Sequence, residues 1–159
     1  MTGRSKHFLA TCAIGLVACV IASAQFVTTT RGMPEVTVHI SEESTLADMR
    51  VLFVQEAEEA DFSILFTYDA NDADYILTRG TDADFVIGQR SLEKADLRIQ
   101  AGEFVSRPHV TVNVIREGEP DYRVFVDRIN FGLNDVVMAI LPALNKALDY
   151  RFEWIPRMD

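Results

Sequence analysis

The sequence is short of the residues that most enzymes and metal sites use. It has two cysteines, one tryptophan and three histidines in 159 residues, and both cysteines, Cys12 and Cys19, fall within the first 24 positions. The remaining chain therefore offers no thiol for a disulfide or a zinc site. Its glycines are scattered without forming a phosphate-binding loop, and no nucleophile-elbow motif surrounds any serine. No motif in the chain identifies an enzyme class.

Positive charge is also scarce. The chain has 15 Lys and Arg against 24 Asp and Glu, which gives a net charge of −9 and a pI near 4.8. This balance argues against nucleic acid as a partner. A hydrophobic content of 48% excludes a disordered chain. With one long apolar stretch, the sequence does not describe a polytopic membrane protein, and its length suits one domain with a short appendage.

Residues 1–24 have the three-part layout of a secretory signal peptide. Arg4 and Lys6 give a basic start, residues 8–21 carry no charge, and Ala22-Ser23-Ala24 is a small-x-small cleavage pattern. The prediction is cleavage after Ala24, which leaves a single exported domain at 25–159 with a net charge of −11.

Two alternatives for this segment stay open. Residues 8–27 are 20 positions long, enough to cross a bilayer as a retained anchor. Leu16-Val-Ala-Cys19 is similar to the lipobox of bacterial lipoproteins, in which the cysteine is acylated. The membrane would then be contacted only through residues 8–27 or through an acylated Cys19. Each version places the domain outside the cytoplasm, in the periplasm or cell envelope, because the basic start stays inside.

The dipeptide Ala-Asp recurs along the middle of the chain. It stands at 47–48, 60–61, 73–74, 83–84 and 95–96, with spacings of 13, 13, 10 and 12 residues. Each copy is followed by apolar residues at alternate positions, which is the period of a strand with one face to the core. The first column is Met49, Phe62, Tyr75, Phe85 and Leu97, and the second is Val51, Ile64, Leu77, Ile87 and Ile99. Because Ile76 and Val86 are apolar on the opposite face, their strands are expected to be covered on both sides.

This block of strand repeats, residues 35–101, resembles the 7(1) septoil knot family. That family strings together short units of the type Ala-Asp-apolar-x-apolar joined by polar turns. The resemblance implies a compact β domain whose chain follows a knotted path. It carries no established activity and no catalytic motif, so it assigns no site residues.

The repeated aspartates have two interpretations. The first is that each carboxylate accepts hydrogen bonds from backbone N–H groups of the preceding turn. The second is a calcium site with oxygen ligands. Its candidate ligands are Asp48, Asp61, Asp74, Asp84 and Asp96, together with Asp69, Asn71 and Asp72. The first interpretation is preferred, and no metal or cofactor is predicted.

The C-terminal part predicts a β-hairpin and a kinked helix. Two alternating segments flank a turn within residues 109–128, which is the pattern of a hairpin. Residues 133–152 have apolar positions at helical spacing, with Pro142 expected to divide the helix near residue 141. The aromatic tail at 150–157 is expected to dock on its own domain. The apolar positions of the helix form a stripe that is expected to cover Ile76 and Val86. The residues of this stripe are Val137, Leu141, Leu144 and Leu148.

The sequence therefore predicts a mainly β fold with a C-terminal helical segment, of the α+β class. The preferred function is a non-enzymatic exported or envelope-anchored module for structure or interaction, with a protein partner that the sequence does not identify. An alternative is a small exported hydrolase that uses His39 or His109 with acidic residues. A third is an accessory subunit of a membrane complex. No catalytic, cofactor-binding or metal-binding residue is assigned.

Overall fold

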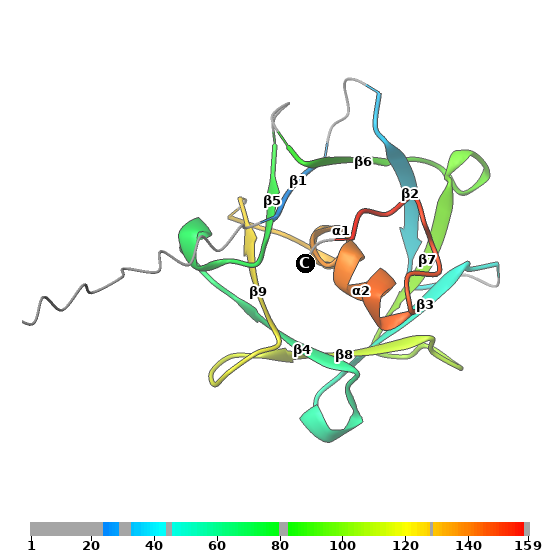
Figure 1. Cartoon of the computed structure of the whole chain (residues 1–159). Helices are drawn as coiled ribbons and strands as arrows, with labels where there is room; N and C mark the ends of the chain where they lie inside the picture. The colour runs from blue at the N-terminus through cyan, green and yellow to red at the C-terminus, as the bar shows by residue number, and fades with distance from the viewer. Residues whose placement is uncertain (1–23, 29–32, 44–45, 80–82, 128, 158–159) are drawn as a thin grey trace, which may run out of the picture.

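The strands of the protein close into one barrel. The computed structural model describes residues 24–28, 33–43, 46–79, 83–127 and 129–157. Nine strands in these residues form a ring, which Figure 1 shows along its axis. They are β1 (Ala24–Thr28), β2 (Val36–Ser41), β3 (Met49–Val54), β4 (Phe62–Phe66), β5 (Tyr75–Thr78), β6 (Phe85–Gln89), β7 (Leu97–Gly102), β8 (Val110–Ile115) and β9 (Tyr122–Val126).

Short helical segments complete the fold. Three single turns of 3-10 helix lie in the polar connections, namely η1 (Ala57–Glu59), η2 (Ala70–Asp72) and η3 (Leu92–Lys94). Two α-helices follow the last strand, α1 (Leu133–Ala139) and α2 (Leu141–Ala147). They meet at Ile140, where Pro142 stands in the first turn of α2. The predicted α+β class and the division of the helix near residue 141 are confirmed.

Every strand pair is parallel, and neighbours in the barrel are far apart in the sequence. The order around the ring is β1-β5-β9-β4-β8-β3-β7-β2-β6, and β6 pairs again with β1. Consecutive strands of the chain therefore lie two places apart in the ring. The chain circles the barrel once from β1 to β5, and the strands of its second circuit, β6 to β9, fill the places left between. All strands consequently end at the same end of the barrel, which we call the carboxyl end.

The alternating columns predicted from the sequence face the interior. All ten of their residues are buried in one hydrophobic cluster, with Phe62 the most exposed at 7%. The outer face of β5 is also buried, since Ile76 is 4% exposed, whereas Val86 is half-buried. The expected cover on both faces is therefore found at Ile76 and only in part at Val86.

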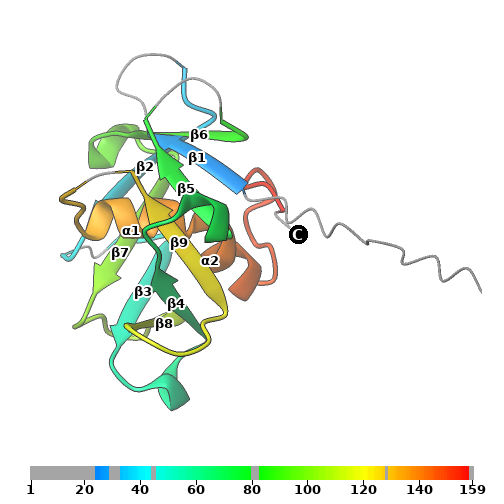
Figure 2. The same ribbon diagram turned by 90° about the vertical axis from the view of Figure 1, so that its left-hand side faces the viewer.

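The two helices fill the inside of the ring. Figure 1 shows both helices within the circle of strands, and in Figure 2 they lie at the level of the strands. Helix α1 packs against β5 and β9 and also against β2 and β7. Leu141 and Leu144 are completely buried in the same cluster as the inner columns. The expectation that this stripe covers Ile76 and Val86 is wrong, because it packs on the opposite, inner face of those strands.

The predicted hairpin at 109–128 is also wrong. β8 pairs with β3 and β4, and β9 pairs with β4 and β5, so β4 stands between them. The turn joining the two segments has the composition of a hairpin turn. Their inner residues, however, complete a barrel only when each strand inserts between strands of the first circuit.

The aromatic tail docks on its own domain, as expected. Asn145 of α2 is fully buried, and its side chain donates to the carbonyl of Phe152 and accepts from the N–H of Phe152, at 2.9 and 3.0 Å. These bonds turn the chain back after α2. Ile155 then reaches the core cluster with 1% exposure, while Trp154 stays 46% exposed.

The predicted targeting segment lies almost entirely outside the described residues. The basic start, the apolar run, Cys12 and Cys19 all belong to residues 1–23. Residues 24–28 form β1 and pair with β5 and β6, so positions 24–27 belong to the barrel. Among the described residues, no helix combines the length and apolar character that a membrane crossing needs.

Candidate functional site

The two histidines considered for catalysis have arginine residues as their hydrogen-bond partners. His39 of β2 contacts the carbonyl of Arg90 through Nδ1 at 3.1 Å. His109, just before β8, contacts Arg50 instead. Among the hydrogen bonds of the described residues, neither imidazole is joined to an Asp or Glu. No His–carboxylate hydrogen bond among the described residues therefore supports the hydrolase alternative.

The aspartates before the strands do accept backbone hydrogen bonds, but from a different place than expected. In five cases one carboxylate oxygen accepts the N–H of a residue in the neighbouring strand at 2.7–2.9 Å. The predicted donors in the preceding turn are wrong, since the true partners are 49–59 residues away. We call each such bond a carboxylate clasp. The pairs are Asp48 with Arg98, Asp61 with Thr111, Asp74 with Arg123, Asp96 with Thr37, and Asp121 with Ser63.

The clasps follow the barrel in one direction. Each aspartate precedes one strand and binds the next strand in the order β5-β9-β4-β8-β3-β7-β2. Side chains reinforce them, because Thr37 donates its hydroxyl to Asp96 at 2.6 Å and Arg98 forms a two-pronged ion pair with Asp48 at 2.9 Å. Accepting these bonds lowers the pKa of both Asp48 and Asp96 from the ordinary value. The aspartates thus close the ends of the ladder where the strands begin.

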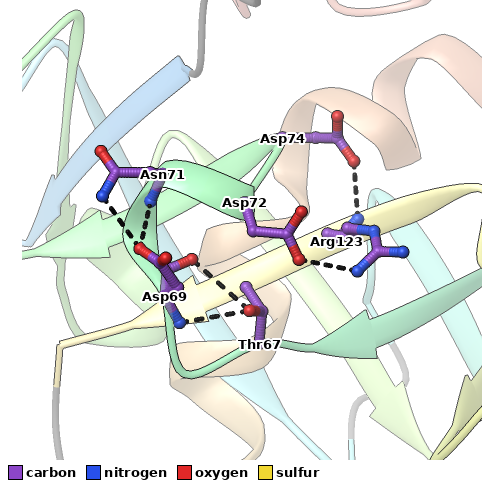
Figure 3. Close-up of polar contacts among 6 residues, drawn as sticks. All are labelled: Thr67, Asp69, Asn71, Asp72, Asp74 and Arg123. Atoms are coloured by element: carbon purple, nitrogen blue, oxygen red, sulfur yellow. Dashed lines mark hydrogen bonds and ion pairs between the residues drawn. The ribbon is translucent and has the colours of Figure 1, made fainter.

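Several of the residues named as candidate calcium ligands have hydrogen-bond partners within the protein. Figure 3 shows Asp69 accepting from the N–H and the side-chain amide of Asn71, both at 2.9 Å. Asp72 is paired with the Arg123 guanidinium at 2.7 Å, and Asp74 accepts the backbone N–H of Arg123. No group of three or more Asp, Glu, His or Cys residues within the described segments is placed to hold a metal ion. Asp69, Asp72 and Asp74 each accept a hydrogen bond from an N–H donor of the protein.

One position of the ring has a histidine in place of the aspartate. His109 precedes β8, and its Nδ1 lies 3.3 Å from the backbone nitrogen of Arg50 in β3, while its Nε2 lies 3.0 Å from Nη2 of Arg50. A neutral imidazole has one bare nitrogen, so it accepts only one of these two bonds. Burial lowers the pKa of His109, and the charges of Arg50 and Arg151 lower it further. The buried Nε of Arg50 has no hydrogen-bond partner among the described residues.

This position gives the fold a defined pH dependence. Because folding lowers the pKa of His109, the unfolded chain binds its proton more readily. The contribution of His109 to stability is therefore complete only above about pH 6.5 and falls as the pH decreases from there. Replacing His109→Asp supplies Arg50 with a carboxylate, as Asp48 does for Arg98. We expect the free energy of unfolding of the variant, measured with urea at pH 7, to be higher than that of wild type by about 1–2 kcal/mol. The gain should grow between pH 7 and 5.5. A constant difference between the two proteins over this range would contradict the role of His109.

Aromatic side chains gather at the carboxyl end of the barrel. They stand at or just after the ends of β3, β4, β7 and β9, and in the segment leading to α1. Phe104 is 94% exposed and Tyr68 is fully exposed, while the rings of Phe66 and Phe131 lie 4.8 Å apart. We call this set the aromatic rim. Its members are Phe53, Phe66, Tyr68, Phe104, Phe125 and Phe131.

Three adjoining pockets open along the aromatic rim. A middle pocket of about 430 Å³ lies over Leu133 and Val136 of α1. The Leu52 pocket, of about 370 Å³, shares Phe53 and Phe104 with the middle pocket. The Ile129 pocket, of about 610 Å³, shares Phe66 with it. The three pockets therefore form a row across the carboxyl end.

The walls of this row are apolar and acidic. Five carboxylates line it, and none of its described lining residues is Lys, Arg or His. Glu103 is shared by the middle pocket and the Leu52 pocket. The five are Glu42, Glu56, Glu59, Glu103 and Asp127.

The sequence interpretation missed the aromatic rim. Its residues are spread from position 53 to position 131, and nothing local distinguishes them. The available signal was that Phe53, Phe66 and Phe104 each stand at or just beyond the end of a strand. Had the strands been recognised as parallel, these positions would have been expected at one end of the sheet.

A comparison of the chain with protein-family models and with curated proteins gives no match.

Proposed function

We propose that the protein is a non-enzymatic interaction module that acts outside the cytoplasm and binds its partner through the aromatic rim. The observation that carries the proposal is the exposure of large apolar side chains at one end of a filled barrel. Phe104, Ile129 and Tyr68 are 94–102% exposed there, beside three pockets. Side chains of this kind at an unfilled groove are typical of recognition surfaces.

The filled interior supports a surface function. Helices α1 and α2 occupy the inside of the ring, where Ile140, Leu141 and Leu144 are completely buried. A barrel of this kind has its packed core where other barrels hold a ligand. Recognition by this domain is therefore assigned to its outer surface.

The proposal is tested with peptides selected from a random displayed library against residues 25–159. We expect them to be rich in aromatic and aliphatic residues and to lose binding at least about tenfold in a Phe104→Ser, Ile129→Ser variant. Leu92→Ser, at a 40% exposed residue of η3, is the matched control and should bind normally. Because all three side chains are exposed, the melting temperatures should stay close to wild type. Peptides that bind the rim variant as well as wild type would refute the proposal.

Export is part of the proposal and rests on the sequence of residues 1–24. The basic start, the uncharged run and the small-x-small pattern support it. The mass of the mature protein from its native host distinguishes the versions. A chain that begins at Gln25 indicates cleavage, an acylated Cys19 indicates a lipoprotein, and an intact N-terminus indicates an anchor. An intact chain recovered from the cytoplasm would contradict export.

The resemblance to the septoil knot family is also carried forward as a proposal. The double circuit of the chain supports it, because each strand of the second circuit enters between two strands of the first. So does the placing of Asp48, Asp61, Asp74 and Asp96 directly before strands that bind their neighbours through these carboxylates. A knotted chain pulled at both ends in a single-molecule experiment would stop short of its full contour length. Full extension would refute the knot.

A further inference from the structure

We infer that the occupant of the aromatic rim is an extended peptide segment of a partner protein in which large apolar residues alternate with Lys or Arg. This inference rests on the proposed function and adds the chemistry of the partner to it. Three features of the described residues carry the argument: the closure of the barrel, the row of three pockets and the sign of the charge around them.

The closure of the barrel decides how a segment is held. Each of the nine strands is paired on both sides, so the ring offers no free strand edge to a partner. A segment therefore binds through its side chains and not by adding a strand to the sheet. Affinity must come from apolar side chains that enter pockets.

The row of pockets suits consecutive side chains of one segment. The middle pocket shares Phe53, Glu103 and Phe104 with the Leu52 pocket and shares Phe66 with the Ile129 pocket, so the row has a fixed order. In an extended peptide, alternate residues point to the same side and are about 6.6 Å apart. Apolar residues at alternate positions can thus enter neighbouring pockets, while the residues between them face the borders of the pockets.

The negative charge at the borders of the pockets favours positively charged residues between the apolar residues of the peptide. Glu42 and Glu103 flank the middle pocket, Glu56 and Glu59 flank the Leu52 pocket, and Asp127 lies at the Ile129 pocket. Lys and Arg place their aliphatic stems on apolar surface and their charge at its border, which fits this arrangement. The same carboxylates repel an anionic lipid surface and a second copy of this acidic rim.

The test compares three synthetic nonapeptides by surface plasmon resonance on residues 25–159. All three carry the same aromatic and aliphatic residues at alternate positions, with Lys, Ser or Glu between them. We expect the Lys peptide to bind at least about tenfold more tightly than the Glu peptide at low salt, mainly through faster association. The difference should shrink as salt is raised, because exposed charges are screened.

Variants of the protein locate the effect. In Glu42→Gln with Glu103→Gln, the preference for the Lys peptide should fall several-fold, whereas Glu93→Gln in η3, outside the three pockets, should leave it unchanged. Phe104→Ser should weaken the binding of the Lys, Ser and Glu peptides to the same extent. Melting temperatures near wild type confirm that each variant is folded.

The outcomes separate the inference from the function on which it rests. Equal binding of the Lys, Ser and Glu peptides, lost in Phe104→Ser, overturns the charge preference and leaves the recognition surface in place. Binding of the Lys peptide that persists in Phe104→Ser, or no binding by any peptide, overturns both. If the protein binds vesicles of phosphatidylcholine with phosphatidylglycerol and Phe104→Ser abolishes that binding, the occupant is a membrane. If the protein dimerises and Phe104→Ser abolishes the dimer, the occupant is a second copy of the chain.

Discussion

Leu144→Ala is expected to lower the free energy of unfolding by about 2–5 kcal/mol. Leu144 lies in α2 inside the ring, is completely buried, and packs in the same cluster as the inner residues of the strands. Truncation there leaves a cavity in the packed core cluster that joins the helices to the inner residues of the strands. A closed ring has little freedom to collapse onto it, which favours the upper part of the range.

Urea unfolding followed by circular dichroism measures this change. Leu92→Ala is the matched control, because the side chain in η3 is 40% exposed and its truncation should cost less than about 0.5 kcal/mol. Equal midpoints for the two leucine variants would mean that the helices are dispensable to the barrel. The interior position of α2 would then be wrong for the protein in solution.

Asp74→Ala is expected to cost about 1–2 kcal/mol of stability. One oxygen of this half-buried carboxylate accepts the N–H of Arg123 at 2.7 Å, and the Asp74 N–H donates to the Arg123 carbonyl. Alanine leaves the first of these backbone groups without its acceptor at the start of the β5–β9 ladder. Partial exposure to water keeps the cost in the lower part of the range for an unsatisfied group.

Asp72→Ala provides the matched control for Asp74→Ala. Asp72 lies two residues earlier and pairs with the Arg123 guanidinium at the surface, at 2.7 Å (Figure 3). Exposed ion pairs of this kind contribute about 0–1 kcal/mol. Thermal melts of both variants compare the clasp with the surface pair. If Asp72→Ala is the more damaging, or if calcium shifts either melt, the role assigned to the carboxylate clasps is incorrect.

A large part of the fold was accessible from the sequence because it depends on local pattern. The alternation after each Ala-Asp pair predicted the inner faces of β3 to β7, including Tyr75 and Phe85, and all of those residues are buried. Pro142 predicted the division between α1 and α2 because a proline is tolerated only in the first turn of a helix. The aspartates were expected to accept backbone N–H groups, and they do.

Which segments pair or pack with one another could not be predicted in the same way. The sequence placed β8 and β9 in a hairpin, whereas β4 stands between them, and it placed the stripe of Leu141 and Leu144 on the wrong face of β5. Hairpin and parallel pairing require the same alternation within each strand. The choice between them depends on which distant segments meet, and a single strand carries no record of that.

The candidate site was less accessible still. The aromatic rim draws Phe53, Phe66, Phe104 and Phe131 from segments up to 78 residues apart, and each is unremarkable in its own segment. The His109 position was visible only as a histidine before a strand. Its meaning came from the ring, which has an aspartate at the corresponding point before β3, β4, β5, β7 and β9.

The sequence by itself determined the strands β3 to β9 and which side of each is apolar, because period-two alternation is a property of neighbouring residues. It also determined the acidic charge of the surface. Only the tertiary structure decided the closure of the ring, the enclosure of α1 and α2, and the meeting of aromatic side chains at the carboxyl end. These features depend on strand pairs 49–59 residues apart, such as Asp61 with Thr111 and Asp96 with Thr37. Such pairs form because together they bury the inner columns and the two helices in one core, a condition that only the whole chain satisfies.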